Sequence, residues 1–279
     1  MIISVASGKG GTGKTTIATS LAFAIGNNVQ LLDCDVEEPN AHIFINPQNV
    51  KTEQVFVLVP RVDETLCNYC GKCSGVCEFN AIAVANKKVL IFDNLCHACG
   101  GCKLLCPQKA ITEIRRVVGK IETGERQGVE LISGVLNVSE AMAIPVISAV
   151  KNKINRQKTV IIDASPGTSC PMVAAVKGSD FCLLVTESTP FGLHDLSLAY
   201  EVTKKMGIPT GLVINKYDSS FTQLEDYCQK EKLAILLKIP EDRQIAEAYS
   251  KGLNLVEVFP EHKEKFLEVM KLIESRIKS

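Results

Sequence analysis

A glycine-rich segment near the start of the chain has the residue types and spacing of a phosphate-binding loop. Residues 8–15 read Gly-Lys-Gly-Gly-Thr-Gly-Lys-Thr and fit the pattern GxxxxGK[ST], directly after an apolar run and directly before a helical segment. Glycines allow successive backbone N–H groups to point at phosphate oxygens, and the helix N-terminus adds a positive dipole. Lys14 is then expected to contact the β- and γ-phosphates, and Thr15 to hold Mg²⁺. A glycine-rich turn that binds nothing is the alternative, and the flanking strand and helix disfavour it.

Aspartates follow two apolar runs that we expect to be neighbouring parallel strands. Asp33 and Asp35 close one run, and Asp163 ends the other. Carboxylates at the carboxyl ends of adjacent parallel strands converge on one crevice, where they can orient Mg²⁺ through water or position an attacking water. We therefore predict catalytic roles for Asp35 and Asp163. Plain solubilising carboxylates are the alternative, which weighs most for Asp33.

Eight of the 12 cysteines lie in two runs with the same spacing, CxxCxxCxxxC. Thiolates two residues apart on a tight turn can bind three corners of one cubane, while the fourth points to a second cluster. This geometry predicts two [4Fe–4S] clusters with exchanged fourth ligands. Paired zinc sites are the alternative, although zinc sites typically use two separated CxxC pairs. The first predicted ligand set is Cys67, Cys70, Cys73 and Cys106, and the second is Cys96, Cys99, Cys102 and Cys77.

The cysteine-rich region resembles bacterial two-cluster ferredoxins over about fifty residues, departing at Glu78, where the first half often has proline. Electron relay is the role that two adjacent clusters suit best, and a purely structural role is the alternative.

Seven short apolar runs predict strands that are covered on both faces, because they do not alternate with polar residues. Helical segments at 14–25, 193–206 and 244–251 lie between several of them, each closed by glycine. The alternation predicts an α/β fold with a doubly wound, mainly parallel sheet. The runs are residues 2–6, 29–33, 55–59, 159–162, 182–186, 211–214 and 235–239.

The cysteine-rich region interrupts this rhythm with an internal repeat of about thirty residues. Its place in the chain predicts a small α+β ferredoxin-like domain, residues 61–112, inserted into a P-loop NTPase domain made of residues 1–60 and 113–279. The polar stretch 119–128 is expected to be a hairpin turn that rejoins the host domain.

Composition narrows the choice of compartment and partner. Thirty-one basic and 31 acidic residues cancel, so we expect neither a nucleic-acid partner nor a stable membrane association. The chain lacks a basic leader and a run of about 18 apolar residues, and its cysteines suit a reducing compartment; we therefore expect a cytoplasmic protein. The terminal apolar stripe Phe266, Met270, Ile273 and Ile277 is expected to pack against the sheet.

Lys9 to Thr16, KGGTGKTT, resembles the deviant Walker A motif KGGxGKTT of the MinD/ParA/Mrp class of P-loop ATPases, which includes the nitrogenase iron protein. The resemblance continues through Asp33-Cys34-Asp35, Asp163 to Thr168, Asn215 to Asp218 and Ile239 to Asp242, and covers the chain outside the insert. It implies bound ATP and Mg²⁺. The implied nucleotide-binding residues are Gly8, Lys9, Gly10, Gly11, Thr12, Gly13, Lys14, Thr15, Thr16, Asn215, Pro240 and Asp242.

The same resemblance implies an ATP-dependent homodimer. A lysine matching Lys9 reaches the partner's ATP, an aspartate matching Asp35 helps to activate water, and Asp163 matches the Walker B carboxylate. Asn215 and the segment Pro240-Glu241-Asp242 match positions that line adenine and ribose. The cysteine pair near the C-terminus of Mrp-type scaffold proteins is absent from this sequence.

Three functions are consistent with these features. The first is an ATPase that couples ATP binding and hydrolysis to electron transfer with a partner protein. The second is assembly or delivery of iron–sulfur clusters or a metallocofactor to an accepting protein, as in the Mrp branch. The third is spatial positioning of cellular cargo, which the balanced charge does not favour.

Overall fold

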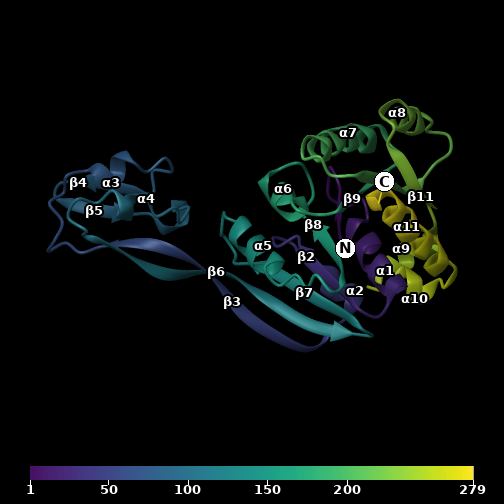
Figure 1. Ribbon diagram of the computed structural model, residues 1–279, viewed down its shortest axis with the longest axis horizontal. Coiled ribbons are helices and arrows are strands. Elements are labelled where there is room, and N and C mark those ends of the chain that lie inside the picture. Colours follow the sequence, from purple (N-terminus) through teal and green to yellow (C-terminus); the bar gives the residue numbers. More distant parts are fainter. Residues whose placement is uncertain (279) are drawn as a thin grey trace.

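The centre of the computed structural model, which describes residues 1–278, is a nine-stranded sheet (Figure 1). Its strand order is β11-β10-β9-β1-β8-β2-β7-β6-β3. The strands from β11 to β7 pair in parallel, and β6 and β3 extend one edge in antiparallel pairing. The prediction of an α/β fold with a mainly parallel sheet is confirmed. The strands are β1 (Ile2–Ala6), β2 (Val29–Cys34), β3 (Gln48–Val62), β6 (Ile111–Arg126), β7 (Val129–Leu136), β8 (Thr159–Ala164), β9 (Phe181–Glu187), β10 (Thr210–Tyr217) and β11 (Ala234–Pro240).

Helices cover both faces of the parallel strands. One apolar core joins the sheet to α1, α2, α10 and α11, and a second core joins its other face to α5, α6, α7 and α8. Phe266 and Ile273 of the terminal helix are fully buried in the first core, which confirms the predicted packing of that stripe. No helix within residues 1–278 combines the length and apolarity needed to cross a membrane. The helices are α1 (Lys14–Ile25), α2 (Ala41–Ile45), α5 (Ile144–Lys151), α6 (Cys170–Val176), α7 (Pro190–Lys205), α8 (Gln223–Glu231), α9 (Arg243–Ser250), α10 (Leu255–Val258) and α11 (Glu261–Lys278).

Strands β3 and β6 form a long two-stranded ribbon that runs beyond the edge of the sheet (Figure 1). The strand predicted at 55–59 is therefore too short, because the polar, exposed first half of β3 gives no apolar signal. The hairpin turn predicted at 119–128 is also wrong. Only Gln127 and Gly128, with φ of 52° and 79°, turn the chain into β7. Gly119 is a packing residue within β6, since a Cβ there would lie 2.4 Å from the Val135 carbonyl oxygen.

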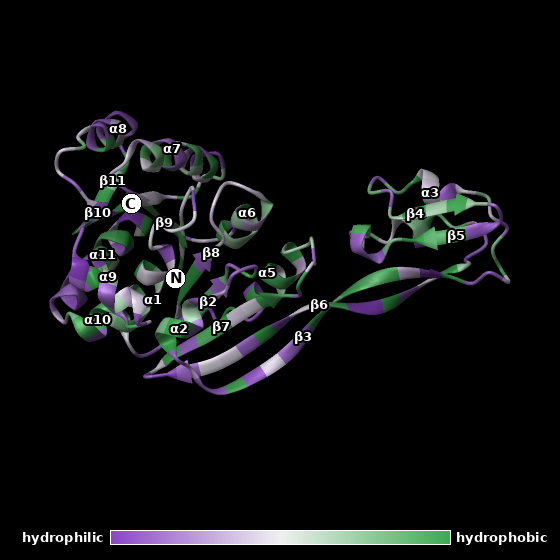
Figure 2. Ribbon diagram, turned by 180° about the vertical axis from the view of Figure 1, so that it is seen from behind, coloured by the Kyte–Doolittle hydropathy of each residue, from purple (hydrophilic) through white to green (hydrophobic). Residues whose placement is uncertain are grey.

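The chain between β3 and β6 folds into a small unit at the far end of the ribbon (Figure 1). It contains α3 (Lys72–Gly75), the hairpin β4 (Ile82–Ala85) and β5 (Lys88–Ile91), a 3₁₀ turn (Asp93–Leu95) and α4 (Gly101–Leu104). Both short helices follow a glycine in the left-handed region, Gly71 at φ 75° and Gly100 at φ 73°. The internal repeat of the sequence thus recurs in the backbone. Hydrophobic colour marks β4 and β5 as well as the central strands in Figure 2.

Candidate nucleotide site and cysteine pockets

The glycine-rich loop joins β1 to α1 at the carboxyl edge of the sheet. Gly11 and Gly13 take φ of 80° and 86°, a region that favours glycine. Two loop positions also have no space for a side chain. A Cβ at Gly13 would lie 2.4 Å from the Asn215 side-chain nitrogen, and a Cβ at Gly8 would lie 2.1 Å from the Asp195 carbonyl oxygen. The loop is therefore packed tightly between Asn215 of β10 and Asp195 of helix α7.

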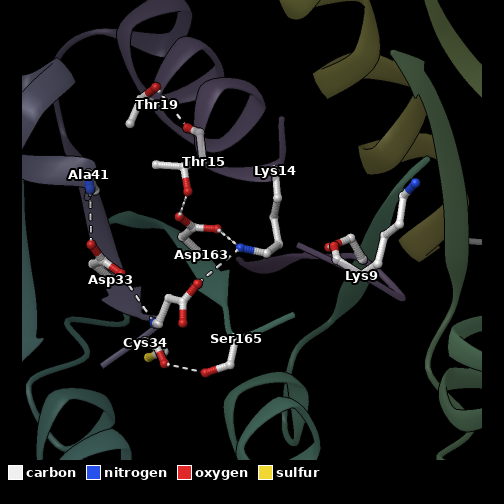
Figure 3. Close-up of polar contacts among 11 residues, drawn as sticks. Lys9, Lys14, Thr15, Thr19, Asp33, Cys34, Ala41, Asp163 and Ser165 are labelled. Carbon is white, nitrogen blue, oxygen red and sulfur yellow. Dashed lines mark hydrogen bonds and ion pairs between the residues drawn. The ribbon is translucent and has the colours of Figure 1, made fainter. Parts of the chain in front are cut away.

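Lys14 and Thr15, the first residues of α1, both contact Asp163 at the end of β8 (Figure 3). The Thr15 hydroxyl donates to Asp163 Oδ2 at 2.6 Å, and Lys14 Nζ donates to Asp163 Oδ1 at 3.3 Å. Lys14 Nζ also lies 3.6 Å from Asp35 Oδ2. The structure thus brings together residues from three separate segments of the chain, and it sets an ammonium, a hydroxyl and two carboxylates close to one another.

Burial and neighbouring charge shift the pKa values of this group. Burial raises the pKa of Asp35 to about 6, against the opposing effect of Lys14. For Lys14, burial opposes protonation, but the carboxylates of Asp163 and Asp35 outweigh it and raise the pKa above its ordinary value. Lys14 therefore stays charged at neutral pH. Its carboxylate partners occupy the ammonium that a phosphate would otherwise contact.

Asp33 has a structural role in this site. Its carboxylate accepts hydrogen bonds from the backbone N–H of Asp35 at 3.1 Å and of Ala41 at 3.0 Å (Figure 3). Burial and the neighbouring Asp163 carboxylate raise the pKa of Asp33 well above its usual range. Asp33 thereby fixes both ends of the loop that carries Asp35.

Two hydroxyls in the loop fit a ligand that is rich in acceptors. The side-chain oxygens of Thr12 and Thr16 are buried and have no hydrogen-bond partner within the described residues. An unpaired buried hydroxyl costs free energy, so such groups normally have a partner when the site is filled. Phosphate oxygens are suitable acceptors for both. The loop residues accordingly fit a bound nucleotide.

Lys9 lies away from Lys14, and its side chain points in the opposite direction (Figure 3). Lys9 Nζ is 3.3 Å from Glu187 at the end of β9, and Lys216 Nζ binds the same carboxylate at 2.6 Å. Burial opposes ionisation of Glu187, but Lys216 and Lys9 outweigh it and lower its pKa. Neither Glu187 nor Lys216 is among the site residues predicted from the sequence. The position of Glu187 at the carboxyl end of an apolar strand was the available signal.

The residues predicted to line adenine and ribose fall into two groups. Asn215, in β10, donates from its side-chain nitrogen to the Thr12 carbonyl at 2.9 Å and so touches the phosphate loop itself. Pro240 ends β11, and Asp242 caps α9 by accepting from the Gln244 N–H at 2.7 Å. Within the described residues, neither Pro240 nor Asp242 forms a hydrogen bond or an ion pair with the phosphate loop.

The eight clustered cysteines line two pockets, four to each. The first pocket is lined by Cys67, Cys70, Cys73 and Cys106, together with apolar side chains of the insert. The second is lined by Cys77, Cys96, Cys99 and Cys102, and by Leu58, Pro60 and Glu113 of the ribbon. The grouping matches the two predicted ligand sets, including the exchange of the fourth cysteine.

The chemistry of the two cysteine sets suits clusters that are ligated by thiolates. All eight cysteines are free thiols, and backbone N–H groups of Tyr69 and Ala81 donate to the sulfurs of Cys67 and Cys77 at 3.4 and 3.3 Å. Across residues 1–278, no group of three or more His, Cys, Asp or Glu side chains is arranged to hold a single metal ion.

Comparisons with known proteins place this site in context. A family model described as the CobQ/CobB/MinD/ParA nucleotide binding domain matches residues 3–256. The uncharacterized protein MJ0579 of Methanocaldococcus jannaschii is 33% identical over 259 residues, which cover 90% of each chain. A stretch of 56 residues, 19% of this chain and 21% of the relative, is 46% identical to the cytosolic Fe-S cluster assembly factor NUBP2 homolog of Nematostella vectensis.

Among solved structures, the septum site-determining protein MinD of Pyrococcus horikoshii, complexed with Mg-ADP, is similar in fold. The likeness covers 96% of this chain and 93% of that chain, with a TM-score of 0.56 and 21% sequence identity. At that identity the likeness shows the fold alone.

Proposed function

Because the chain belongs to the CobQ/CobB/MinD/ParA family of nucleotide-binding proteins, we propose that it is a Mg²⁺-dependent ATPase that carries two [4Fe–4S] clusters and couples ATP binding and hydrolysis to electron transfer with a partner protein. The observation that carries the proposal is the presence of two four-thiol pockets on the same chain as a phosphate loop with two carboxylates against its lysine.

In the nucleotide half, the loop residues bind the phosphates. Lys14 exchanges its carboxylate partners for the β- and γ-phosphates, and the hydroxyls of Thr12 and Thr16 gain acceptors. Thr15 and Asp163, already joined by a hydrogen bond, would hold Mg²⁺, which would neutralise charge on the phosphates. Asp35 becomes free of Lys14 and orients the attacking water.

Lys9 is proposed to act across an ATP-dependent homodimer, as the sequence resemblance implies. In the single chain Lys9 pairs with Glu187, a carboxylate that it shares with Lys216. When Lys9 leaves Glu187 to bind a phosphate of the partner's ATP, it exchanges one anionic partner for another. Asn215, Pro240 and Asp242 are proposed to line the base and ribose.

In the cluster half, the two cysteine sets would each hold one cluster. A [4Fe–4S] cluster supplies one-electron transfer, with a potential set by hydrogen bonds to its sulfurs and by its exposure. The chain provides N–H groups to two of those sulfurs and apolar walls from the insert. We propose residues 61–112 as the cluster-bearing domain, inserted in an ATPase domain of residues 1–60 and 113–279.

The short match to a cluster assembly factor favours one alternative, in which the protein delivers clusters to an apo-protein. Electron transfer is preferred because all eight thiols are committed to the two pockets, whereas a delivered cluster needs a ligand that can be exchanged. Retention of both clusters after turnover with an apo-acceptor separates the two functions.

The proposed function is tested by anaerobic EPR of the reconstituted protein, titrated with dithionite with and without Mg-ATP. We expect about eight irons per chain and a spectrum that changes with Mg-ATP. Lys14→Ala should retain the iron and lose the response to nucleotide. Cys170→Ser, a change at an exposed cysteine outside both pockets, is the matched control and should alter neither. Identical titrations with and without nucleotide would count against coupling between nucleotide binding and the clusters. An iron content near zero would exclude the proposed clusters.

A further inference from the structure

We propose that the loop between β7 and α5, residues 137–143, connects the Asp35 loop, residues 35–40, to the β3–β6 ribbon. Through this connection the binding of nucleotide beside Asp35 changes the ribbon, and Glu140 and Arg116 are its positioning residues. The inference rests on the proposed function. It adds the route by which the two halves of the protein influence each other.

On the nucleotide side, the chain that carries Asp35 is bonded directly to β7. Leu136, the last residue of β7, donates its N–H to the Val36 carbonyl oxygen at 2.8 Å. Val36 is fully buried, and a Cβ at Gly134 would lie 2.7 Å from its side chain. Val36 therefore packs against β7 at Gly134, where a larger residue would clash with it. A movement of Asp35 must either displace the end of β7 as well or break the contacts of Val36 with Gly134 and Leu136.

On the ribbon side, the β7–α5 loop is fixed to β6 by backbone and side-chain bonds. The N–H of Asn137 donates to the Val118 carbonyl at 3.0 Å, and its side-chain nitrogen donates to the Val117 carbonyl at 3.2 Å. The Arg116 guanidinium binds both oxygens of Glu140, at 2.5 and 3.3 Å. The side chain of Glu140 is only 5% exposed and that of Arg116 18%. A bidentate pair at this depth holds one geometry better than a surface ion pair does.

From Arg116 the ribbon continues directly to the second cysteine pocket. In the β3–β6 register Arg116 lies opposite Val57, and Pro60 lies opposite Glu113. Pro60 and Glu113 line the pocket that contains Cys77 and Cys96. Antiparallel pairing is continuous from Arg116 to Glu113, and this paired stretch offers a path by which a displacement at Arg116 would reach the pocket.

These contacts form one continuous route from Asp35 through Val36, Leu136, Asn137 and the Glu140–Arg116 pair to the ribbon. A route of contacts becomes a coupling only if nucleotide shifts the state of the ribbon and the shift depends on the connection. That dependence can be measured on amide protons, without using the clusters as the readout.

The experiment is hydrogen–deuterium exchange of the anaerobically reconstituted full chain, with and without the non-hydrolysable nucleotide Mg-AMPPNP. In the wild type we expect exchange at residues 111–118 to change about fivefold or more, the lower end of typical coupling. In Glu140→Gln the change should fall below about twofold while the Kd for Mg-AMPPNP stays the same. The charge-reversed pair Arg116→Glu with Glu140→Arg restores the ion pair and should recover the response, which separates loss of coupling from loss of folding.

Glu53→Gln is the matched control. Glu53 forms an exposed ion pair with Lys153 at 2.7 Å, and this pair joins β3 to the segment after α5. Unlike the Glu140–Arg116 pair, it lies outside the route from Asp35 to the ribbon. Glu53→Gln should leave the response intact. A wild-type response that persists in Glu140→Gln overturns the inference, as does a wild type that binds Mg-AMPPNP without any change in the ribbon. If the wild type does not bind Mg-AMPPNP at all, that result excludes the proposed ATPase function, and the inference is excluded with it.

Discussion

Replacing Asp35 by asparagine should stabilise the nucleotide-free protein at neutral pH and abolish ATP hydrolysis. Asp35 is largely buried, with a side chain 13% exposed, and burial raises its pKa from 3.8 to about 6. A carboxyl group with a raised pKa binds its proton more tightly in the folded than in the unfolded state. Folding stability is therefore lost as the pH rises from about 4 through about 6, and the loss is complete above that range.

The size of the effect follows from the pKa difference. A difference of about two pH units, at about 1.4 kcal/mol each, gives up to about 3 kcal/mol at pH 7. Asparagine resembles the protonated carboxyl and does not ionise. We therefore expect Asp35→Asn to raise the free energy of unfolding by about 1 to 3 kcal/mol at pH 7 and to change it little at pH 4.

Urea unfolding of the nucleotide-free protein, followed by far-UV circular dichroism, measures this difference. The chain has no tryptophan, and all described helices longer than four residues lie outside the insert, so the helical signal reports on the part of the chain that surrounds the nine-stranded sheet. Destabilisation of the protein by Asp35→Asn at pH 7, or a difference from wild type that is the same at pH 4 and pH 7, would contradict a raised pKa of Asp35 in the folded state.

Four further results are expected. The kcat/KM for ATP should fall about tenfold per pH unit below about pH 6, because Asp35 must be ionised to orient water, and a flat acid limb would contradict this role. Gly8→Ala should lower stability by about 1 to 3 kcal/mol and weaken ATP binding, since its Cβ would meet the Asp195 carbonyl; a wild-type Tm would argue against that packing. Thr16→Val should raise the melting temperature of the nucleotide-free protein, because it removes a buried hydroxyl that has no partner there, and should weaken ATP binding about tenfold, as judged by calorimetry, because that hydroxyl is lost as a donor to phosphate. Cys106→Ser should halve the iron content to about four per chain, and retention of about eight would exclude Cys106 from the first pocket.

Local sequence signals were sufficient for the parts of the site that lie directly after strands. The phosphate loop, Asp35 and Asp163 follow apolar runs, and adjacent parallel strands bring such ends together. The register pairs Asp33 directly with Asp163. The pairing of Cys106 with the first cysteine set was likewise predictable, because each run has the same spacing and the two halves repeat.

Features that depend on side-chain packing between distant elements were not predictable from the sequence. Glu187 binds Lys9 and Lys216 from three separate segments, and no spacing in the sequence links Glu187 to either lysine. The ribbon was underestimated because the first half of its outer strand, β3, is polar and exposed, and because β6 carries a glycine at 119 that resembles a turn residue. That glycine is required by the close approach of Val135, which only the folded sheet shows.

The insert enters and leaves the ribbon at a single place, because Val62 at the end of β3 lies opposite Ile111 at the start of β6. The residues between Val62 and Ile111 are thus the connection of a β-hairpin, whatever the number of residues in that connection. Loop-closure entropy grows only slowly with length, and the hairpin already holds the two ends together. The host sheet should therefore tolerate exchange of this tip for a two-residue turn or for another module of comparable end-to-end span, so the same nucleotide-binding domain can acquire different inserted modules in the course of evolution.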